Sequence, residues 1–175
     1  MSSFVLFATP WWVNFLILIP FIPYLLSKKE KIGISKKRLL EASLVAIAFG
    51  FMEAAVVVYL RAAIGLLPGQ QANTFVALPE NLFRIECFRE AATMIMLGGI
   101  ALLTARSTKE KVVAFLWTFA FWDVFYYVWL RLTIGWPSSF LDSDVLFLIP
   151  VPWVAQVWFP ILVSGLTALV IWFRS

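Results

Sequence analysis

Histidine is absent from this 175-residue sequence, and cysteine occurs once, as Cys87. The lack of histidine excludes His-ligated haem, His-ligated zinc or copper, histidine acid–base catalysis and the Ser-His-Asp triad. A single cysteine excludes an intrachain disulfide and a cluster of thiolate ligands. The sequence therefore predicts neither a cofactor nor a metal centre. The one alternative that stays open in principle is a carboxylate site at Glu53, Glu86, Glu90 and Asp123, which would suit Mg²⁺ or Mn²⁺ better than zinc.

Charge is also scarce, since 14% of the residues are charged while 62% are hydrophobic. A soluble domain has roughly 45–50% apolar and about 25% charged residues. So short a chain cannot bury this excess of apolar surface, and we expect the lipid bilayer to cover it. The formal net charge of +4 comes from loops that flank apolar segments, so it indicates membrane topology and no nucleic-acid partner.

Five apolar segments are long enough to span a bilayer core of about 30 Å, which takes ~20 helical residues. They are Phe4–Leu26, Leu39–Leu66, Leu82–Ala105, Val112–Gly135 and Pro150–Phe173. The first lacks the basic flank and small-residue cleavage site of a signal peptide, so we expect a true span. The predicted fold is all-α, a single integral membrane helical bundle of five transmembrane helices over residues 1–175.

The basic residues predict the orientation of the chain. They gather in loops 27–38 and 106–111 and at Arg174, whereas loops 67–81 and 136–149 contain no Lys or Arg. The positive-inside rule then places the N-terminus outside and the C-terminus in the cytoplasm. Both outer loops hold a short apolar stretch, Phe75–Leu78 and Val145–Leu148. These stretches are too short to span, so we expect them at the interface or dipping back into the bundle.

An internal similarity recurs at an offset of 70 residues. Phe49–Glu53 matches Phe119–Asp123, and Val58–Arg61 matches Val128–Arg131, so an acid and an arginine recur at the same spacing. The match predicts a tandem two-helix repeat with a pseudo-two-fold axis along the membrane normal. Its units are 39–105 and 109–175, with 1–27 as an extra N-terminal helix.

Two long strings, Trp122–Arg131 and Leu146–Val154, carry a resemblance together with Arg89–Ala92. With them the chain resembles a set of small prokaryotic polytopic membrane proteins of uncharacterised activity. The resemblance covers most of the chain from the second apolar segment onward. It implies a multi-pass protein of the prokaryotic plasma (inner) membrane, and it implies no activity.

Polar residues inside the apolar segments are the candidate site. A charged side chain at mid-membrane costs roughly 2.5–3.5 kcal/mol, so such groups usually face the bundle interior. At ~1.5 Å per residue, each segment places one polar side chain about 18–27 Å from its cytoplasmic flank. These side chains are Asn14, Glu53, Glu90, Asp123 and Gln156. Their common depth predicts one interior site that binds a substrate or a proton.

Neighbours on the same helix faces extend this site. Glu86 shares a face with Glu90, Arg89 lies three residues after Glu86, and Tyr127 lies four residues after Asp123. Glu53 and Asp123 are the leading candidates because they are deep, acidic and related by the repeat.

Structural roles remain alternatives for several of these residues. Glu86, Arg89 and Glu90 can form an ion-pair cluster, while Asn14 and Gln156 favour interhelical hydrogen bonds. Arg61 and Arg131 lie outward of the repeat's acids, where they favour contact with an anionic group such as lipid phosphate.

Three classes of function are compatible with this pattern. Paired membrane carboxylates favour a small proton- or cation-linked transporter or channel. A short chain without a soluble domain also suits an accessory or assembly subunit of a larger membrane complex, or a homo-oligomer. An enzyme that uses carboxylates on a lipid or isoprenoid is the least favoured alternative.

Overall fold

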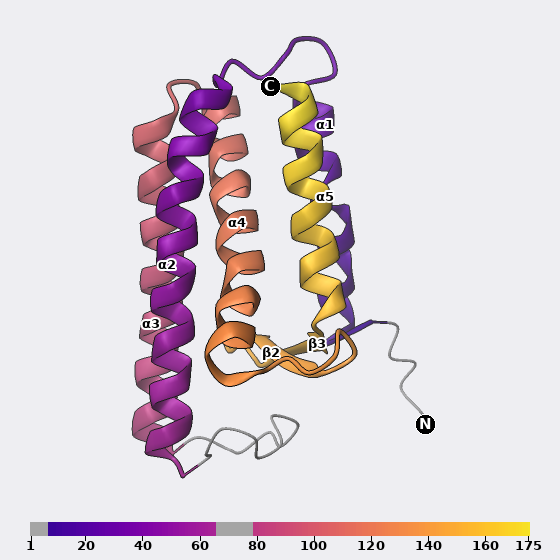
Figure 1. Ribbon diagram of the computed structural model, residues 1–175. Coiled ribbons are helices and arrows are strands. Elements are labelled where there is room, and N and C mark those ends of the chain that lie inside the picture. The colour runs from indigo at the N-terminus through magenta and orange to yellow at the C-terminus, as the bar shows by residue number, and fades with distance from the viewer. Residues whose placement is uncertain (1–6, 66–78) are drawn as a thin grey trace.

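The computed structural model describes residues 7–65 and 79–175 (Figure 1). The described residues are mostly helical. Three long helices form most of the bundle: α2 (Lys36–Ala63), α3 (Glu80–Thr104) and α4 (Thr108–Ile134). All three are long and apolar enough to cross a membrane, by length and composition. Their bounds lie close to those of the predicted second, third and fourth segments.

Local sequence signals set the ends of these helices. The Ser35 side chain accepts a hydrogen bond from the Arg38 amide at the start of α2. Ser107 and Glu110 form a reciprocal capping box at the start of α4, which satisfies amides that the first turn leaves unpaired. Gly135 ends α4 with a φ of 73°, a left-handed conformation that glycine adopts without steric cost.

The first apolar segment is not the continuous α-helix that the sequence predicts. Its described part forms strand β1 (Ala8–Thr9), the 3₁₀ helix η1 (Trp11–Leu18) and the short helix α1 (Phe21–Leu26). Pro10 precedes η1 and Pro20 precedes α1. A proline lacks the amide that an α-helix needs in its interior, so this segment divides into shorter elements.

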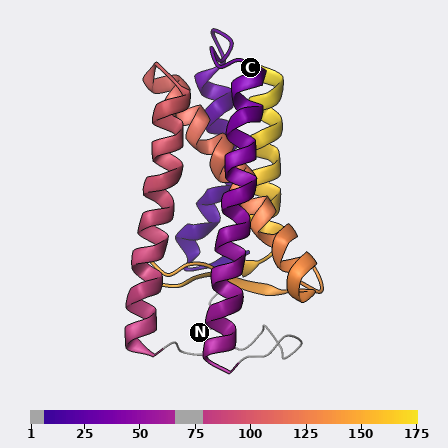
Figure 2. The same ribbon diagram turned by 60° about the vertical axis from the view of Figure 1, so that its left-hand side comes forward.

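The last segment and the loop before it also correct the all-α prediction. Helix α5 is Trp158–Arg174, and two strands precede it, β2 (Ser143–Phe147) and β3 (Trp153–Gln156). The strands form an antiparallel sheet in the order β1-β3-β2. β2 contains most of the apolar stretch that begins at Val145, whereas Phe75–Leu78 lies outside the described residues. Figure 2 shows the sheet crossing one end of the bundle, away from the C-terminus.

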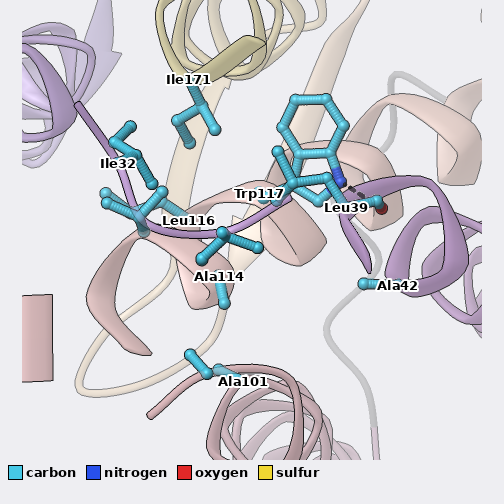
Figure 3. Packing of buried hydrophobic residues seen from close by; sticks show 11 residues of the cluster. Ile32, Leu39, Ala42, Ala101, Ala114, Leu116, Trp117 and Ile171 are labelled. Carbon is cyan, nitrogen blue, oxygen red and sulfur yellow. Dashed lines mark hydrogen bonds between the residues drawn. The ribbon is translucent and has the colours of Figure 1, made fainter. Parts of the chain in front are cut away.

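Helix α4 lies centrally and packs against α2, α3 and α5. It approaches α2 closely at Gly50, where an added Cβ would lie 3.0 Å from the Trp122 carbonyl oxygen. Near the C-terminal end of the bundle, Trp117 of α4 packs with Leu39 and Ile171, as Figure 3 shows. The Trp117 indole donates to the Leu39 carbonyl at 2.8 Å. These contacts make α4 the element around which the other helices are arranged.

The predicted tandem symmetry remains a prediction. At the offset of 70 residues Glu86 is aligned with Gln156. The two differ in local structure, because Glu86 lies in α3 whereas Gln156 lies in β3. The strands before α5 account for this difference.

Candidate functional site: an acidic cavity with aromatic walls

A cavity of about 1380 Å³ lies between the helices and above the sheet. Helices α2, α3, α4 and α5, strand β2 and the loops beside it contribute to its lining. Six carboxyl side chains line it: Glu53, Glu86, Glu90, Asp123, Asp142 and Asp144. Two guanidinium groups, Arg61 and Arg89, line it as well. With every group ionised, the described lining carries a surplus of four negative charges.

One wall carries an ion-pair cluster between α2 and α3. Glu53 is 4% exposed, and its Oε2 contacts Nη1 of Arg89. The same guanidinium donates to Oε2 of Glu86 from Nε at 3.0 Å and from Nη2 at 2.8 Å. Thr93 donates its hydroxyl to Oε1 of Glu53 at 2.6 Å. Arg89 therefore joins two buried carboxylates from different helices.

Glu90 connects the same wall to the sheet. Its two carboxylate oxygens accept from the Leu148 amide at 2.8 and 3.0 Å. Leu148 follows β2 directly, so the end of the apolar stretch Val145–Leu148 lies against α3. The carboxylate satisfies a backbone donor that the end of the strand leaves unpaired.

The opposite wall is formed by α4 and α5. Asp123 is 9% exposed, and its Oδ2 accepts from the Ser164 hydroxyl at 2.7 Å. One turn further along α4, the Tyr127 phenol donates to Oδ2 of Asp144 at 2.9 Å. Among the described residues no arginine or lysine forms a salt bridge with Asp123. On this wall the hydrogen bonds to the carboxyl groups come from neutral hydroxyl groups.

Two acids of the segment between α4 and β3 have opposite pKa shifts. Burial raises the pKa of Asp144 to about 6, although the hydrogen bond from Tyr127 acts against the shift. Burial also acts to raise the pKa of Asp142, but hydrogen bonds from Ser138 and Ser139 hold it below its usual range. The two carboxyl groups therefore differ in their readiness to take a proton near neutral pH.

Arg61 and Arg131, which the predicted repeat would pair, have different surroundings in the structure. The Arg61 guanidinium lies 4.6 Å from the centre of the Trp136 ring and lines the cavity. Arg131 donates to the carbonyl oxygens of Gly135 and Pro137, at 2.5 and 2.9 Å. Arg131 thus closes the C-terminal end of α4 and does not line the cavity.

Asn14 and Gln156, both predicted to reach the interior site, lie outside the cavity lining. The Asn14 amide bonds the backbone of Phe7, Ala8 and Trp11. The Gln156 carbonyl oxygen accepts from the Trp158 indole at 2.8 Å. Both side chains bond residues close to them in the sequence. Asn14 lies in a 3₁₀ helix and Gln156 in a strand, so the height estimated for them along a continuous α-helix does not apply.

Sequence reasoning missed several polar groups of this site. Thr93 and Ser164 are hydroxyl residues within apolar helices, and Asp144 lies in a segment that the sequence predicts as a loop, where acids are common. The sequence offered one signal, since Thr93 follows Arg89 by one helical turn. Asp144 reaches Tyr127 only because the strand brings it back against α4.

The acids do not gather into one cluster. Within the ranges 7–65 and 79–175, no group of three or more Cys, Asp or Glu side chains is placed to hold a metal ion. The chemistry available at the cavity is attraction of positive charge and exchange of protons between carboxyl groups and hydroxyls. No protein-family model, curated protein or solved structure matches the chain.

Proposed function

We propose that this protein is a polytopic membrane protein that binds a positively charged solute or a proton in its interior cavity and moves it across the bilayer. The single observation that carries the proposal is the lining of six carboxyl groups against two guanidinium groups. A surplus of negative charge behind apolar walls favours a cation, because a low dielectric strengthens the attraction.

The membrane setting rests on the three long apolar helices and on their exposed surface. Large apolar side chains such as Leu44, Phe88 and Leu103 are 69%, 77% and 91% exposed. In this proposal lipid covers them, with η1 and α1 together forming one further span, α5 forming the fifth, and the basic loops in the cytoplasm.

Asp123 is the group we expect to bind the cation or exchange the proton. It faces a hydroxyl and not a guanidinium, so an incoming cation meets no bound positive charge at this carboxylate. Glu53 and Glu86 already share Arg89, which leaves them in a structural role on the opposite wall.

The test is cation and proton movement by purified protein in liposomes. Under an imposed gradient, a pH-sensitive dye inside the liposomes should report flux for the natural chain and a loss of at least tenfold for Asp123→Asn. Glu41→Gln is the matched control, because Glu41 is an exposed acid paired with Lys37 outside the cavity. It should retain full flux.

Two outcomes would overturn the proposal. If Asp123→Asn has the same flux as the natural chain, transport does not use the cavity acid to which the proposal assigns it. Absence of flux, combined with constant copurification of a membrane partner, would favour the role of an assembly subunit.

A further inference from the structure

We infer that the cavity binds amphiphilic ammonium compounds that carry a hydrogen-bond acceptor next to the cationic group. This inference rests on the proposed function and names the class of solute. Three properties of the cavity support it: its size, its aromatic walls and the unpaired donors in those walls.

The size of the cavity exceeds what an inorganic ion needs. Pockets for drug-sized ligands measure about 300–1,000 Å³, and this cavity has about 1380 Å³. Its carboxyl groups are divided between walls that belong to different helices. Space of this kind suits an organic ligand with an apolar body and one charged end.

Aromatic rings supply much of the wall beside the acids. A continuous series of rings runs from Trp122 to Tyr126, Tyr127 and Trp136, with centroids 6.5, 5.1 and 6.1 Å apart in that order. An ammonium group within about 6 Å of such a ring centre is attracted by the π-electrons. Asp123 lies next to Trp122 in the sequence and Asp144 is bonded to Tyr127, so carboxylates adjoin one end of this series and its middle. Rings and acids together are the features that bind organic ammonium groups.

Unpaired donors in the walls indicate the second part of the ligand. Trp122 and Trp136 are each 8% exposed and line the cavity. Their indole N–H groups are buried and have no acceptor in the described part of the chain, and the same holds for Trp153. A buried donor without a partner costs about 1–3 kcal/mol. A ligand with ester, amide or phosphate oxygens near its cation would satisfy these groups.

The experiment compares three single-chain probes by equilibrium titration of protein in nanodiscs of phosphatidylglycerol, with empty nanodiscs as the blank. Lauroylcholine has a cation, an acceptor ester and an apolar chain. Dodecyltrimethylammonium has the cation and the chain, and laurate has the chain and a negative charge. We expect lauroylcholine to bind most tightly, dodecyltrimethylammonium about three- to tenfold more weakly, and laurate not at all.

Variants assign the binding to the residues named. Asp123→Asn should weaken binding of both cations at least tenfold. Trp136→Phe keeps an aromatic ring and removes the N–H, so it should weaken lauroylcholine about three- to tenfold more than it weakens dodecyltrimethylammonium. The matched control is Trp11→Phe, because Trp11 is 72% exposed and lies outside the lining. Monodispersity and helical circular dichroism of each variant confirm that it folds, and Trp122→Phe is the second indole variant if Trp136→Phe does not.

The lipid composition of the nanodiscs distinguishes a membrane lipid from a free amphiphile as the natural ligand. Phosphatidylethanolamine carries an ammonium group next to phosphate oxygens, so nanodiscs that contain it should compete with lauroylcholine if a membrane lipid is the natural occupant. Unchanged affinity in those nanodiscs would indicate a free amphiphile.

The inference is overturned if laurate binds as tightly as lauroylcholine, or if Asp123→Asn does not weaken the two cations. In either case, proton or inorganic-cation flux that depends on Asp123 would leave the proposed function intact. If the flux does not depend on Asp123, the proposed function itself is refuted.

Discussion

On the wall formed by α2 and α3, two glutamates share one guanidinium, whereas on the wall formed by α4 and α5 the carboxylate of Asp123 meets only a neutral hydroxyl. Both walls bury their acids, since Glu53 is 4% and Asp123 is 9% exposed. A buried acid bound to a cation completes a structural pair, and its removal leaves the partner charge uncompensated. A buried acid beside a hydroxyl keeps its capacity for an external cation. The structure therefore gives different partners to Glu53 and Asp123, two residues that the predicted tandem repeat would make equivalent.

The largest effect should follow from removal of the shared guanidinium. Arg89→Met leaves Glu53 and Glu86 without a counter-charge, and we expect a loss of about 3–5 kcal/mol in the free energy of unfolding. Denaturant unfolding in detergent micelles measures it. Arg84→Gln on the same helix is the control, because Arg84 pairs with Glu80 at an exposed site and such pairs contribute about 0–1 kcal/mol. Equal losses in the two variants would contradict the assigned role of Arg89.

Amide substitutions on the two walls should have the next largest effect on the free energy of unfolding, and the effect should differ between the walls. Glu53→Gln loses the charge that faces Arg89, and we expect a destabilisation of about 1.5–3 kcal/mol. Asp123→Asn keeps an oxygen that accepts from Ser164, so we expect a change within about 1 kcal/mol. Thermal unfolding of both purified variants checks the difference. If Asp123→Asn is the more destabilising of the two, Asp123 has a structural role and the proposed cation site is wrong.

The smallest effect concerns pH and the segment that carries the sheet. The pKa of Asp144 is about 6 in the folded chain and about 3.9 in an unfolded chain. The folded state therefore binds this proton more tightly, and its contribution to stability falls as the pH rises from about 4 to about 6. Lowering the pH from 7 to 5 should restore about 1 kcal/mol through this group.

Asp144→Asn should abolish that part of the pH dependence, and the measured quantity is the difference between the natural chain and the variant at the two pH values. Asp142 is the internal comparison, because its lowered pKa predicts a contribution that is lost as the pH falls. A variant at Asp144 with the natural pH profile would show that this carboxyl group is not buried in the folded protein.

Much of the helical framework could be predicted from the sequence. The starts of α2 and α4 follow capping serines, and a long uninterrupted apolar run leaves the backbone no other way to pair its own polar groups. The first and last segments could not be predicted in the same way. They contain prolines, and several backbone groups left unpaired there find partners across the sheet, in residues far apart in the chain such as Ala8 and Ala155.

The sequence by itself determined that the chain is rich in apolar helices, that His and thiolate chemistry are excluded, and that a few acids and arginines lie within those helices. It did so because composition and helical periodicity are local properties. Only the tertiary structure decided which acid has which partner. Arg89 could pair with Glu86 on its own helix, but its contact with Glu53 depends on how α3 packs beside α2. Likewise, Asp123 is hydrogen-bonded by Ser164 and Asp144 by Tyr127 because α5 and β2 pack against α4. The spacing of such distant residues along the chain does not predict their contact.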